Sequence, residues 1–328
     1  MTQPTNAYAT NDAKGIREDL SNIIANISPY EVPFQSNAKK KKVTTTRTEW
    51  QTDSLVAAST SNAVIEGDDA TMDAAVATVR VGNITQIMDK TVTITGTLEA
   101  VDKAGRKSEL AYQLTKKGRE LRRDKEAILL NNQASLVGDD TTARKLGGLP
   151  SWLTSNVSRA SGGSNGGYST STALTVAATD ATAGAVRTFT ETLLKAVQQS
   201  CYSNGGEPTI MSLSPFTKGQ FSNTTNFPGI ASLRSNVTQT GGQATVIGAA
   251  DVYLGDFGTL QVVVNRFQRA REAFLLDKEY YSVGTLRPLQ QWELAKTGDA
   301  EKRQMLEELT LIVDNESAHG VIADLQTS

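Results

Sequence analysis

The sequence has few of the residues that most often carry catalysis and cofactor binding. It contains one cysteine, Cys201, and one histidine, His319, in 328 residues. A single cysteine excludes an internal disulfide framework and fits a reducing compartment. One histidine cannot form a multi-histidine zinc site, and no cysteine or acidic residue stands at ligand spacing from it. We therefore expect no metal site, no cofactor and no catalytic residue.

Signatures of nucleophilic and phosphate-binding enzymes are also missing. Gly-x-Ser-x-Gly does not occur, and the glycines within 162–167 are not followed by Gly-Lys-Ser/Thr. Asp256-Phe-Gly258 matches a kinase tripeptide, but a catalytic-loop His-Arg-Asp is absent, so we predict a hairpin turn there. Glu66, Asp68 and Asp69 lack the spacing and the closing glutamate of a calcium loop, which favours a solvated tip. An enzyme is the least favoured class of function.

Aromatic residues, long apolar runs and excess charge are scarce as well. Aromatic residues make up 6% and hydrophobic residues 38% of a chain long enough for two packed units. The chain therefore has few apolar residues with which to form a core. We expect it to have extended parts that are stabilised by neighbouring subunits. No apolar run approaches the ~18 residues that span a bilayer. The first residues lack the basic and apolar regions of a signal peptide, so we expect a soluble protein without membrane contact, in a cytoplasm-like setting.

The charge balance argues against a protein that grips nucleic acid tightly. There are 33 basic and 35 acidic residues, and the formal net charge is −2. A protein that neutralises many phosphates usually carries a basic excess. We therefore predict that tight non-specific DNA binding is absent.

Residues 108–135 predict one long amphipathic helix around which the rest is organised. Its apolar stripe is formed by four residues at helical spacing: Leu110, Leu114, Leu121 and Ile128. No proline interrupts the stretch, and Gly138 follows where a helix stop is expected. A helix of this length would extend over ~40 Å, so we expect it to pack across another structural element, with one face buried and the other exposed to solvent.

The other side of this helix is rich in lysine and arginine, and two interpretations stay open. The basic residues face DNA or acidic neighbours, or they form a solvated side paired with Glu120 and Glu126. The second interpretation is favoured.

The segments before the helix resemble arms. Residues 11–28 predict a short amphipathic helix whose apolar face includes Ile16, Leu20, Ile23 and Ile24. This helix either docks on its own core or clips onto a neighbouring subunit. The run Lys39–Lys42 predicts a solvated loop, or else an electrostatic contact with an acidic patch, a nucleic acid or a sister chain.

Two β-prone segments, 43–51 and 77–97, are polar on both faces and flank a Ser/Ala/Asn/Asp-rich stretch. They predict a hairpin with a long tip that projects from the body. An isolated two-stranded hairpin is only marginally stable in water, so we expect another molecule to stabilise it. We expect inter-subunit contacts through these arms, at Ile16, Leu20, Ile23, Ile24, Lys39, Lys40, Arg47 and Trp50.

Beyond the long helix the pattern turns to α/β and then to strands. The glycine-rich segment 161–167 predicts a surface loop or a domain boundary. The later elements that we expect are a helix near 186–197, a strand at 209–213, a helix opening at Ser214-Pro215, and strands at 245–254, 259–265, 289–296, 302–314 and 320–325.

This order of parts resembles the major capsid proteins of tailed bacteriophages, which have the Hong Kong 97-type fold. Arg17-Glu-Asp-Leu-Ser-Asn-Ile-Ile-Ala-Asn-Ile-Ser-Pro-Tyr-Glu-Val-Pro-Phe34 resembles the opening segment of the SU-ten major head protein family. The segment 294–320 resembles its closing segment. The resemblance implies an α+β fold with an N-terminal arm (1–42), an extended loop (43–97), a peripheral domain with a spine helix (98–174), an axial domain (175–265) and C-terminal peripheral strands (266–328).

The resemblance also implies a function. Subunits of such proteins form pentamers and hexamers that close into an icosahedral virion shell around double-stranded DNA, and assembly takes place in the host cytoplasm. The implied partners are copies of the chain, a portal, a decoration protein and weakly held DNA. A long helical segment before the arm that could act as a cleavable scaffold is not apparent, so a separate protein would have to supply a scaffold if one is needed. The alternatives are an encapsulin-like compartment shell and, less favoured, a surface or adhesin-like β-protein.

The apolar stripe yields a first prediction. Leu121→Asp places a charge on the predicted buried face of the long helix, so the variant should not fold. Circular dichroism and thermal melting of the expressed protein measure this. A soluble variant that melts cooperatively would show that the stripe is misplaced.

Overall fold

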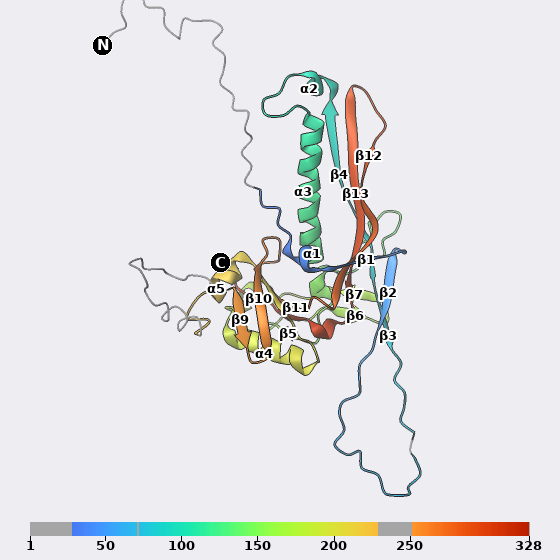
Figure 1. Cartoon of the computed structure of the whole chain (residues 1–328), viewed down its shortest axis with the longest axis vertical. Coiled ribbons are helices and arrows are strands. Elements are labelled where there is room, and N and C mark those ends of the chain that lie inside the picture. Colours follow the sequence, from blue (N-terminus) through green and yellow to red (C-terminus); the bar gives the residue numbers. More distant parts are fainter. Residues whose placement is uncertain (1–27, 71, 229–250, 328) are drawn as a thin grey trace, which may run out of the picture.

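The computed structural model describes residues 28–70, 72–228 and 251–327. A tall unit, in which a long helix stands beside long strands, rises from a lower unit built around a six-stranded sheet (Figure 1). An extended arm leaves the junction and points away from both units. The arm therefore starts where the two units meet, and the described residues that lead to the N-terminus, 28–37, lie beside the lower part of the long helix.

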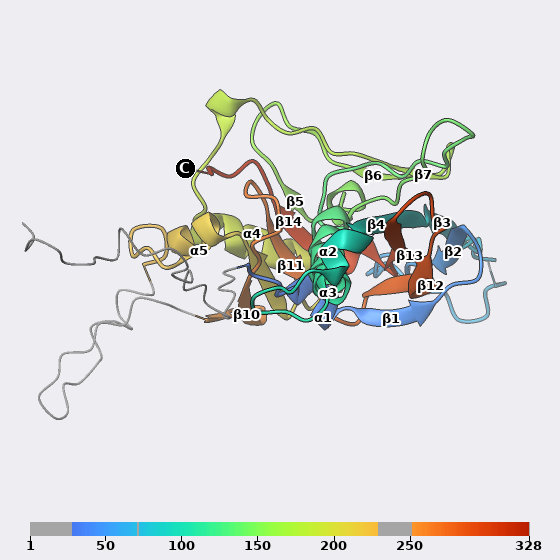
Figure 2. The same cartoon turned by 90° about the horizontal axis from the view of Figure 1, so that it is seen from above.

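The tall unit consists of the long helix α3, the short helix α2 and a four-stranded sheet of order β1-β12-β13-β4. Its elements are α3 (Glu109–Leu129), β1 (Lys39–Lys42), β12 (Tyr281–Glu293), β13 (Ala300–Val313), β4 (Gln86–Thr95) and α2 (Gly96–Ala100). Helix α3 stands against this sheet (Figure 2), and Lys90 pairs with Asp124 at 2.6 Å. A side chain at Gly118 would lie 3.3 Å from the Met305 methyl group, so glycine permits the close approach of α3 to β13.

The lower unit is a mixed sheet of order β5-β14-β11-β8-β10-β9. Its strands and helices are β5 (Val157–Ser158), β14 (Gly320–Ile322), β11 (Ala273–Leu276), β8 (Ile210–Leu213), β10 (Gly258–Val264), β9 (Val252–Gly255), α4 (Glu191–Ser203) and α5 (Pro215–Phe221). The strand at 209–213 and the helix opening at Ser214-Pro215 are confirmed. Ser214 caps α5, because its hydroxyl accepts a hydrogen bond from the Thr217 N–H.

Shorter elements complete the described residues. They are α1 (Pro33–Asn37), β2 (Arg47–Thr52), β3 (Val79–Ile84), β6 (Gly167–Ser169), β7 (Leu174–Val176) and the 3-10 turns η1 (Leu149–Ser151), η2 (Ala183–Ala185) and η3 (Glu316–Ala318). No helix among all these elements has the length and apolarity that a membrane crossing requires.

Two hydrophobic clusters form the core, as expected for two packed units. The first joins α3 to the tall sheet and to one side of the lower sheet, with Leu121, Leu129 and Leu309 among its members. The second lies between the lower sheet and its helices, around Leu194 and Leu260. Leu121 is 1% exposed, which confirms it as a core residue of the long helix, and Ile128 packs against the same cluster.

The long helix is shorter than the sequence predicts. It begins where expected, because the Ser108 hydroxyl caps it by accepting from the Ala111 N–H at 3.2 Å. It ends at Leu129 rather than near residue 135, since Leu129 and Leu130 are both fully buried and the chain turns inward there. Gly138 is not the helix stop; it lies at φ +76° in the loop that the Leu136–Lys145 bridge closes.

The lysine run and the second β-prone segment also differ from the prediction. Lys39–Lys42 is not a loop but strand β1, paired in parallel with β12, although its four side chains are exposed. The segment 77–97 is two strands, because Thr85 interrupts it: β3 pairs with β2 in the arm, whereas β4 pairs with β13 in the tall sheet. Only the first half of the segment therefore belongs to the projecting hairpin.

The C-terminal third is shared between the two sheets. Strands β12 and β13 pair as the predicted long hairpin of the tall unit. Strands β11 and β14, from the same part of the chain, pair with β8 and β5 in the lower unit. The expected boundary near residue 265 therefore does not separate the sheets, and the lower sheet includes strands that come after it.

The single histidine closes the loop between β13 and β14. His319 is fully buried, and its Nδ1 accepts a hydrogen bond from the Asp277 N–H at 3.2 Å. Its Nε2 lies 3.4 Å from the Tyr280 carbonyl oxygen, so the neutral ring with hydrogen on Nε2 satisfies both contacts. Burial lowers the pKa of His319 to about 4, although Glu316 and Asp314 oppose the shift.

The buried ring predicts a loss of stability in acid. The unfolded histidine binds a proton below about pH 6.5, whereas the folded one does so only near pH 4. The stability is therefore full above pH 6.5 and falls until about pH 4, by roughly 3 kcal/mol from this group. Urea unfolding at several pH values measures the slope. His319→Asn should flatten it, and an equal slope in both proteins would contradict the assignment.

Candidate functional site

The projecting arm extends away from all other parts of the chain that the structure describes. Strands β2 and β3 pair in antiparallel fashion from Arg47–Ile84 to Thr52–Val79, and the connecting loop extends beyond them (Figure 1). Leu55 and Met72, one on each limb of the loop, are each 98% exposed. Apolar side chains held in water at this level indicate a surface that another molecule covers.

The arm is fastened firmly at its root. Trp50 of β2 packs on Trp152 with ring centres 5.3 Å apart, and Trp152 stacks on Tyr168 at 5.6 Å. The Asn83 side chain of β3 donates to the carbonyl oxygens of Leu311 and Gly147, at 2.7 Å and 3.1 Å. Because these contacts are buried, the direction in which the arm leaves the body is fixed.

A buried carboxylate stabilises the point at which the arm becomes the tall sheet. Glu308 of β13 accepts hydrogen bonds from the Thr85 hydroxyl and the Arg287 Nε, each at 2.7 Å, and from Arg144. Burial raises the pKa of Glu308, but these hydrogen bonds outweigh it, so the pKa lies below its ordinary value. The carboxylate stays ionised and holds β4, β12 and the loop after α3 together.

A second buried carboxylate holds the segment that leads to the N-terminus. Glu126 of α3 accepts from the N–H groups of Phe34 and Gln35, at 2.7 Å and 3.1 Å, and from the Asn265 side chain at 2.7 Å. Burial raises the pKa of Glu126, whereas these donors favour its charged form. The prediction of a solvated Glu126 that pairs with the basic side of the helix is therefore wrong.

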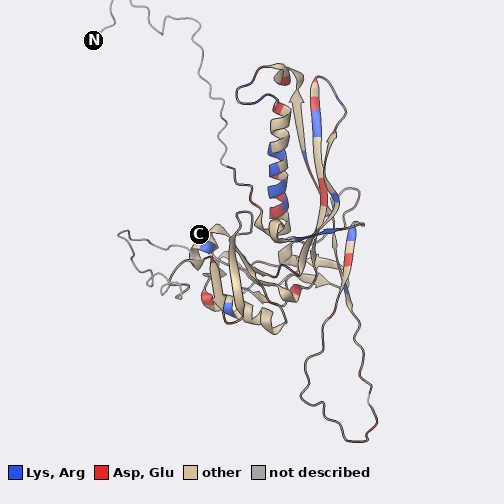
Figure 3. Ribbon diagram, in the orientation of Figure 1, with Lys and Arg blue, Asp and Glu red and all other residues tan. Residues whose placement is uncertain are grey.

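The basic side of α3 remains largely without acidic partners. Figure 3 shows lysine and arginine positions, coloured blue, along much of the helix. Lys117 pairs with Glu120 at 2.7 Å and Lys125 with Glu307 at 2.9 Å. Within the described residues, no carboxylate lies within ion-pair distance of the other four cations, which are Lys116, Arg119, Arg122 and Arg123.

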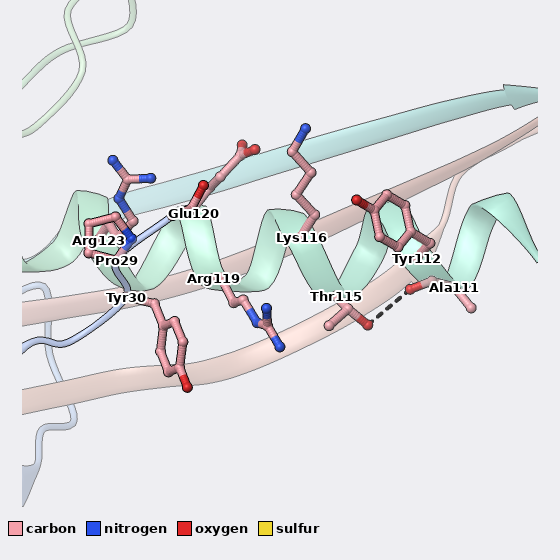
Figure 4. Close-up of a pocket in the computed structure, with 10 residues that line it drawn as sticks. Pro29, Tyr30, Ala111, Tyr112, Thr115, Lys116, Arg119, Glu120 and Arg123 are labelled. Carbon is pink, nitrogen blue, oxygen red and sulfur yellow. Dashed lines mark hydrogen bonds between the residues drawn. The ribbon is translucent and has the colours of Figure 1, made fainter. Parts of the chain in front are cut away.

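A groove runs along this side of the helix (Figure 4). It encloses about 390 Å³ between α3 and residues 28–30, and its lining combines cations with apolar surface. The Arg119 guanidinium lies 5.2 Å from the centre of the Tyr30 ring, a cation–π contact that holds residues 28–30 beside the helix. Tyr112 lines the groove farther along.

The structure places the predicted contact residues in different settings. Ile16, Leu20, Ile23 and Ile24 lie outside the described residues. Lys39 and Lys40 are exposed on β1, at the edge of the tall sheet. Arg47 and Trp50 are partly buried at the root of the arm, where Arg47 donates to the Ala173 carbonyl oxygen at 2.9 Å. The role of all eight residues between subunits stays a prediction.

In the predicted stripe, Leu110 and Leu114 are only half-buried, unlike Leu121.

The sequence did not reveal three buried polar residues that fix the arm and the N-terminal segment: Glu126, Glu308 and Asn83. Hydrophobic periodicity cannot find a buried polar residue, and the one available signal was an acidic residue inside a strongly basic stretch.

The described residues offer little that resembles enzyme chemistry. Asp256-Phe-Gly258 lies at the turn between β9 and β10, as predicted. Cys201 is buried, and burial raises the pKa of its thiol to about 12. Across residues 28–70, 72–228 and 251–327, no three His, Cys, Asp or Glu side chains gather as a metal site would require.

Comparison with known proteins gives consistent results. The family model described as SU10 major capsid protein matches residues 3–326. The major capsid protein of Escherichia phage Phieco32 is 39% identical over 134 residues, a match that covers 41% of this chain and only 38% of that protein.

Solved structures share the fold at low sequence identity. The capsid of Cyanophage A-1(L) has a TM-score of 0.65 at 12% identity, covering 97% of this chain and 98% of that one. The Phage G structure of gp27 major capsid and gp26 decoration proteins has a TM-score of 0.56 at 10% identity, covering 99% and 100%. The SrpI encapsulin of Synechococcus elongatus has a TM-score of 0.55 at 9% identity, covering 95% and 93%.

The Glu126 joint yields a prediction with a control on the same helix. Glu126→Gln keeps the shape but turns an amide toward groups that donate hydrogen bonds. We expect the free energy of unfolding to fall by about 2–4 kcal/mol, measured by urea denaturation. Glu120→Gln removes only a partly exposed ion pair with Lys117 and should cost less than about 1 kcal/mol. Equal effects of the two variants would contradict a structural role for Glu126.

Proposed function

Because the chain belongs to the SU10 major capsid protein family and has the predicted α+β Hong Kong 97-type fold, we propose that it builds the shell of a tailed double-stranded DNA bacteriophage. The family match, which runs from residue 3 to residue 326, carries this proposal. The projecting arm supports it. Its apolar side chains are exposed, and no other described segment covers its loop, which suits a repeated contact between copies.

We propose that copies form pentamers and hexamers that close into an icosahedral shell. Residues 1–42 act as the N-terminal arm, and 43–97 contain the extended loop, whose projecting part is the β2–β3 hairpin because β4 pairs in the tall sheet. Residues 98–174, with the spine helix α3, form the peripheral domain, and 175–265 form the axial domain. The tail, 266–328, contributes strands to both sheets. Each arm contact is weak alone, but many of them repeated over a closed shell give a stable particle.

The same proposal covers partners and location. Packaged DNA lies inside the shell with weak contacts, which suits a net charge of −2. A separate scaffolding protein, a decoration protein and the portal are further proposed partners. We propose that assembly takes place in the cytoplasm of the bacterial host. Negative-stain electron microscopy of the purified protein tests the function. A compact monomer at high concentration, with its arms folded back on its own body, would contradict it.

A compartment shell is the second candidate, because an encapsulin shares the fold. The two candidates differ in what the shell encloses. Particles purified from the native source should contain DNA in the first case and a protein cargo in the second.

The N-terminal arm yields a prediction. Deleting residues 1–30 leaves Phe34, Gln35 and their bonds to Glu126 in place, so the subunit should still fold. We expect it to assemble at least about tenfold less well, because the predicted apolar face with Leu20, Ile23 and Ile24 is lost. Circular dichroism measures folding, and electron microscopy measures shells. Normal shells would show that the arm is not a clip.

A further inference from the structure

A cluster of charged side chains lies where four remote segments meet at the lower sheet. The segments are 158–163 at the end of β5, 179–187 after β7, 269–272 ahead of β11 and 323–326 after β14. Backbone hydrogen bonds tie the last segment to each of the other three. The cluster consists of four arginines and three carboxylates: Arg159, Arg187, Arg269, Arg271, Asp180, Glu272 and Asp324.

The two most deeply buried carboxylates of the cluster have few acceptor sites left. Asp324 accepts hydrogen bonds from the N–H groups of Ala160 and Ala181, at 3.2 Å and 2.8 Å. Glu272 accepts from Arg269 through Oε1, whereas its Oε2 is buried and has no hydrogen-bond partner. One buried carboxylate oxygen therefore remains free.

The arginines, by contrast, keep many buried donors without an acceptor. The Arg159 side chain is 5% exposed, and none of its three guanidinium nitrogens donates to a described residue. Oxygens of Asp180 and Asp324 each lie 3.9 Å from its Nη1, beyond hydrogen-bond distance. The Nε atoms of Arg187 and Arg271 are buried without an acceptor too. Because a guanidinium has five N–H groups, about seven donors stand against the one free oxygen.

This surplus of donors indicates what the cluster lacks. A buried donor without an acceptor costs free energy, and an ordered water or ion commonly satisfies such a group. A water molecule would accept hydrogen bonds but would bring two donors of its own, whereas an anion only accepts. The charges point the same way, since four positive side chains face three negative ones. Both arguments favour an anion over water.

We propose that the cluster binds a small inorganic anion of the size of chloride, with the Arg159 guanidinium as its principal donor. The aspartate oxygens lie beside Nη1, so Nε and Nη2 are the donors left for the ligand, and a single atom can accept from both arms of this fork. The site lies within one copy and therefore does not depend on the proposed shell function.

Arg187 supplies a second reason for an anion at this place. Burial lowers the pKa of Arg187, Asp324 opposes the shift, and the charge of Arg159 lowers the pKa further. Two guanidinium groups that feel each other's charge in a partly dry site repel, and an anion between them removes the repulsion. The ligand thereby joins the segment after β5 to the segment before α4.

Glu272 makes the binding of the anion depend on pH. Burial raises the pKa of Glu272 to about 7, although Arg269 and Arg159 oppose the shift, and Asp180 and Asp324 add to it. Below pH 7 the carboxyl is neutral, so the cluster loses a negative charge and the free oxygen can carry a hydrogen that the anion accepts. We expect the anion to bind at least about threefold more tightly at pH 6 than at pH 8.

A chloride titration of the full-length protein tests the site. Exchange of chloride for gluconate at constant ionic strength separates binding from screening. The Tm should rise by at least about 3 °C between trace and about 200 mM chloride, and bromide should give the same rise. The line width of the chlorine NMR signal measures binding directly. A Tm and a line width that do not respond to chloride would show that the cluster holds water only, and would overturn the proposal.

Variants assign the effect to the cluster. Arg159→Gln should abolish both responses to chloride, whereas Arg119→Gln, which removes an exposed cation of α3, should keep them. Arg159→Lys retains the charge without the fork and should weaken chloride binding at least about tenfold, which serves if Arg159→Gln does not fold. Glu272→Gln fixes the neutral form and should bind chloride equally at pH 6 and pH 8. Chloride binding of wild-type strength in either folded variant of Arg159 would overturn the proposal and leave the proposed shell function untouched.

Discussion

The carboxylate of Glu126 joins three parts of the chain that are distant in sequence. It accepts backbone hydrogen bonds at the start of α1, it belongs to the middle helix α3, and it takes an amide hydrogen from Asn265 after β10. All of its partners are donors, so the ionised form satisfies them and a neutral acid would not. A buried charge is costly unless it is fully hydrogen-bonded, and here that condition fixes the position of the segment that leads to the N-terminus.

Glu308 serves the same purpose on the other side of the molecule. With Arg144, Arg287 and Thr85 it fixes the point where the arm strand β3 gives way to β4. The start of the described N-terminal segment and the root of the arm are thus each fixed by a buried carboxylate, Glu126 and Glu308 respectively. The loop of the β2–β3 arm then extends into water, and its Leu55 and Met72 side chains are almost fully exposed. This contrast between fixed roots and uncovered ends is what a subunit of a larger assembly requires.

The distribution of charge adds to the same conclusion. The net charge is close to zero, but all charged residues of the arm tip are acidic. One side of α3 carries cations that have no acidic ion-pair partner among the described residues. In the proposed shell, charged side chains that have no partner within one copy can meet opposite charges on a neighbouring copy. Such contacts steer association and set its register more than they add affinity. They also weaken in high salt, which leaves errors in assembly correctable.

The sequence by itself determined the elements and the family. The position of the long helix, the capped start of α5, the β9–β10 turn and the long hairpin of the tail all follow from periodicity, caps and turn residues, because these are local preferences. The end segments were sufficient to indicate the capsid family. Only the tertiary structure decided which strands pair: Lys39–Lys42 became a strand because β12 offers an open edge, and residues 77–97 divided at Thr85 because two different sheets compete for them. It also decided that Glu126 is internal, since the burial of a polar residue depends on hydrogen-bond donors that come from remote parts of the chain.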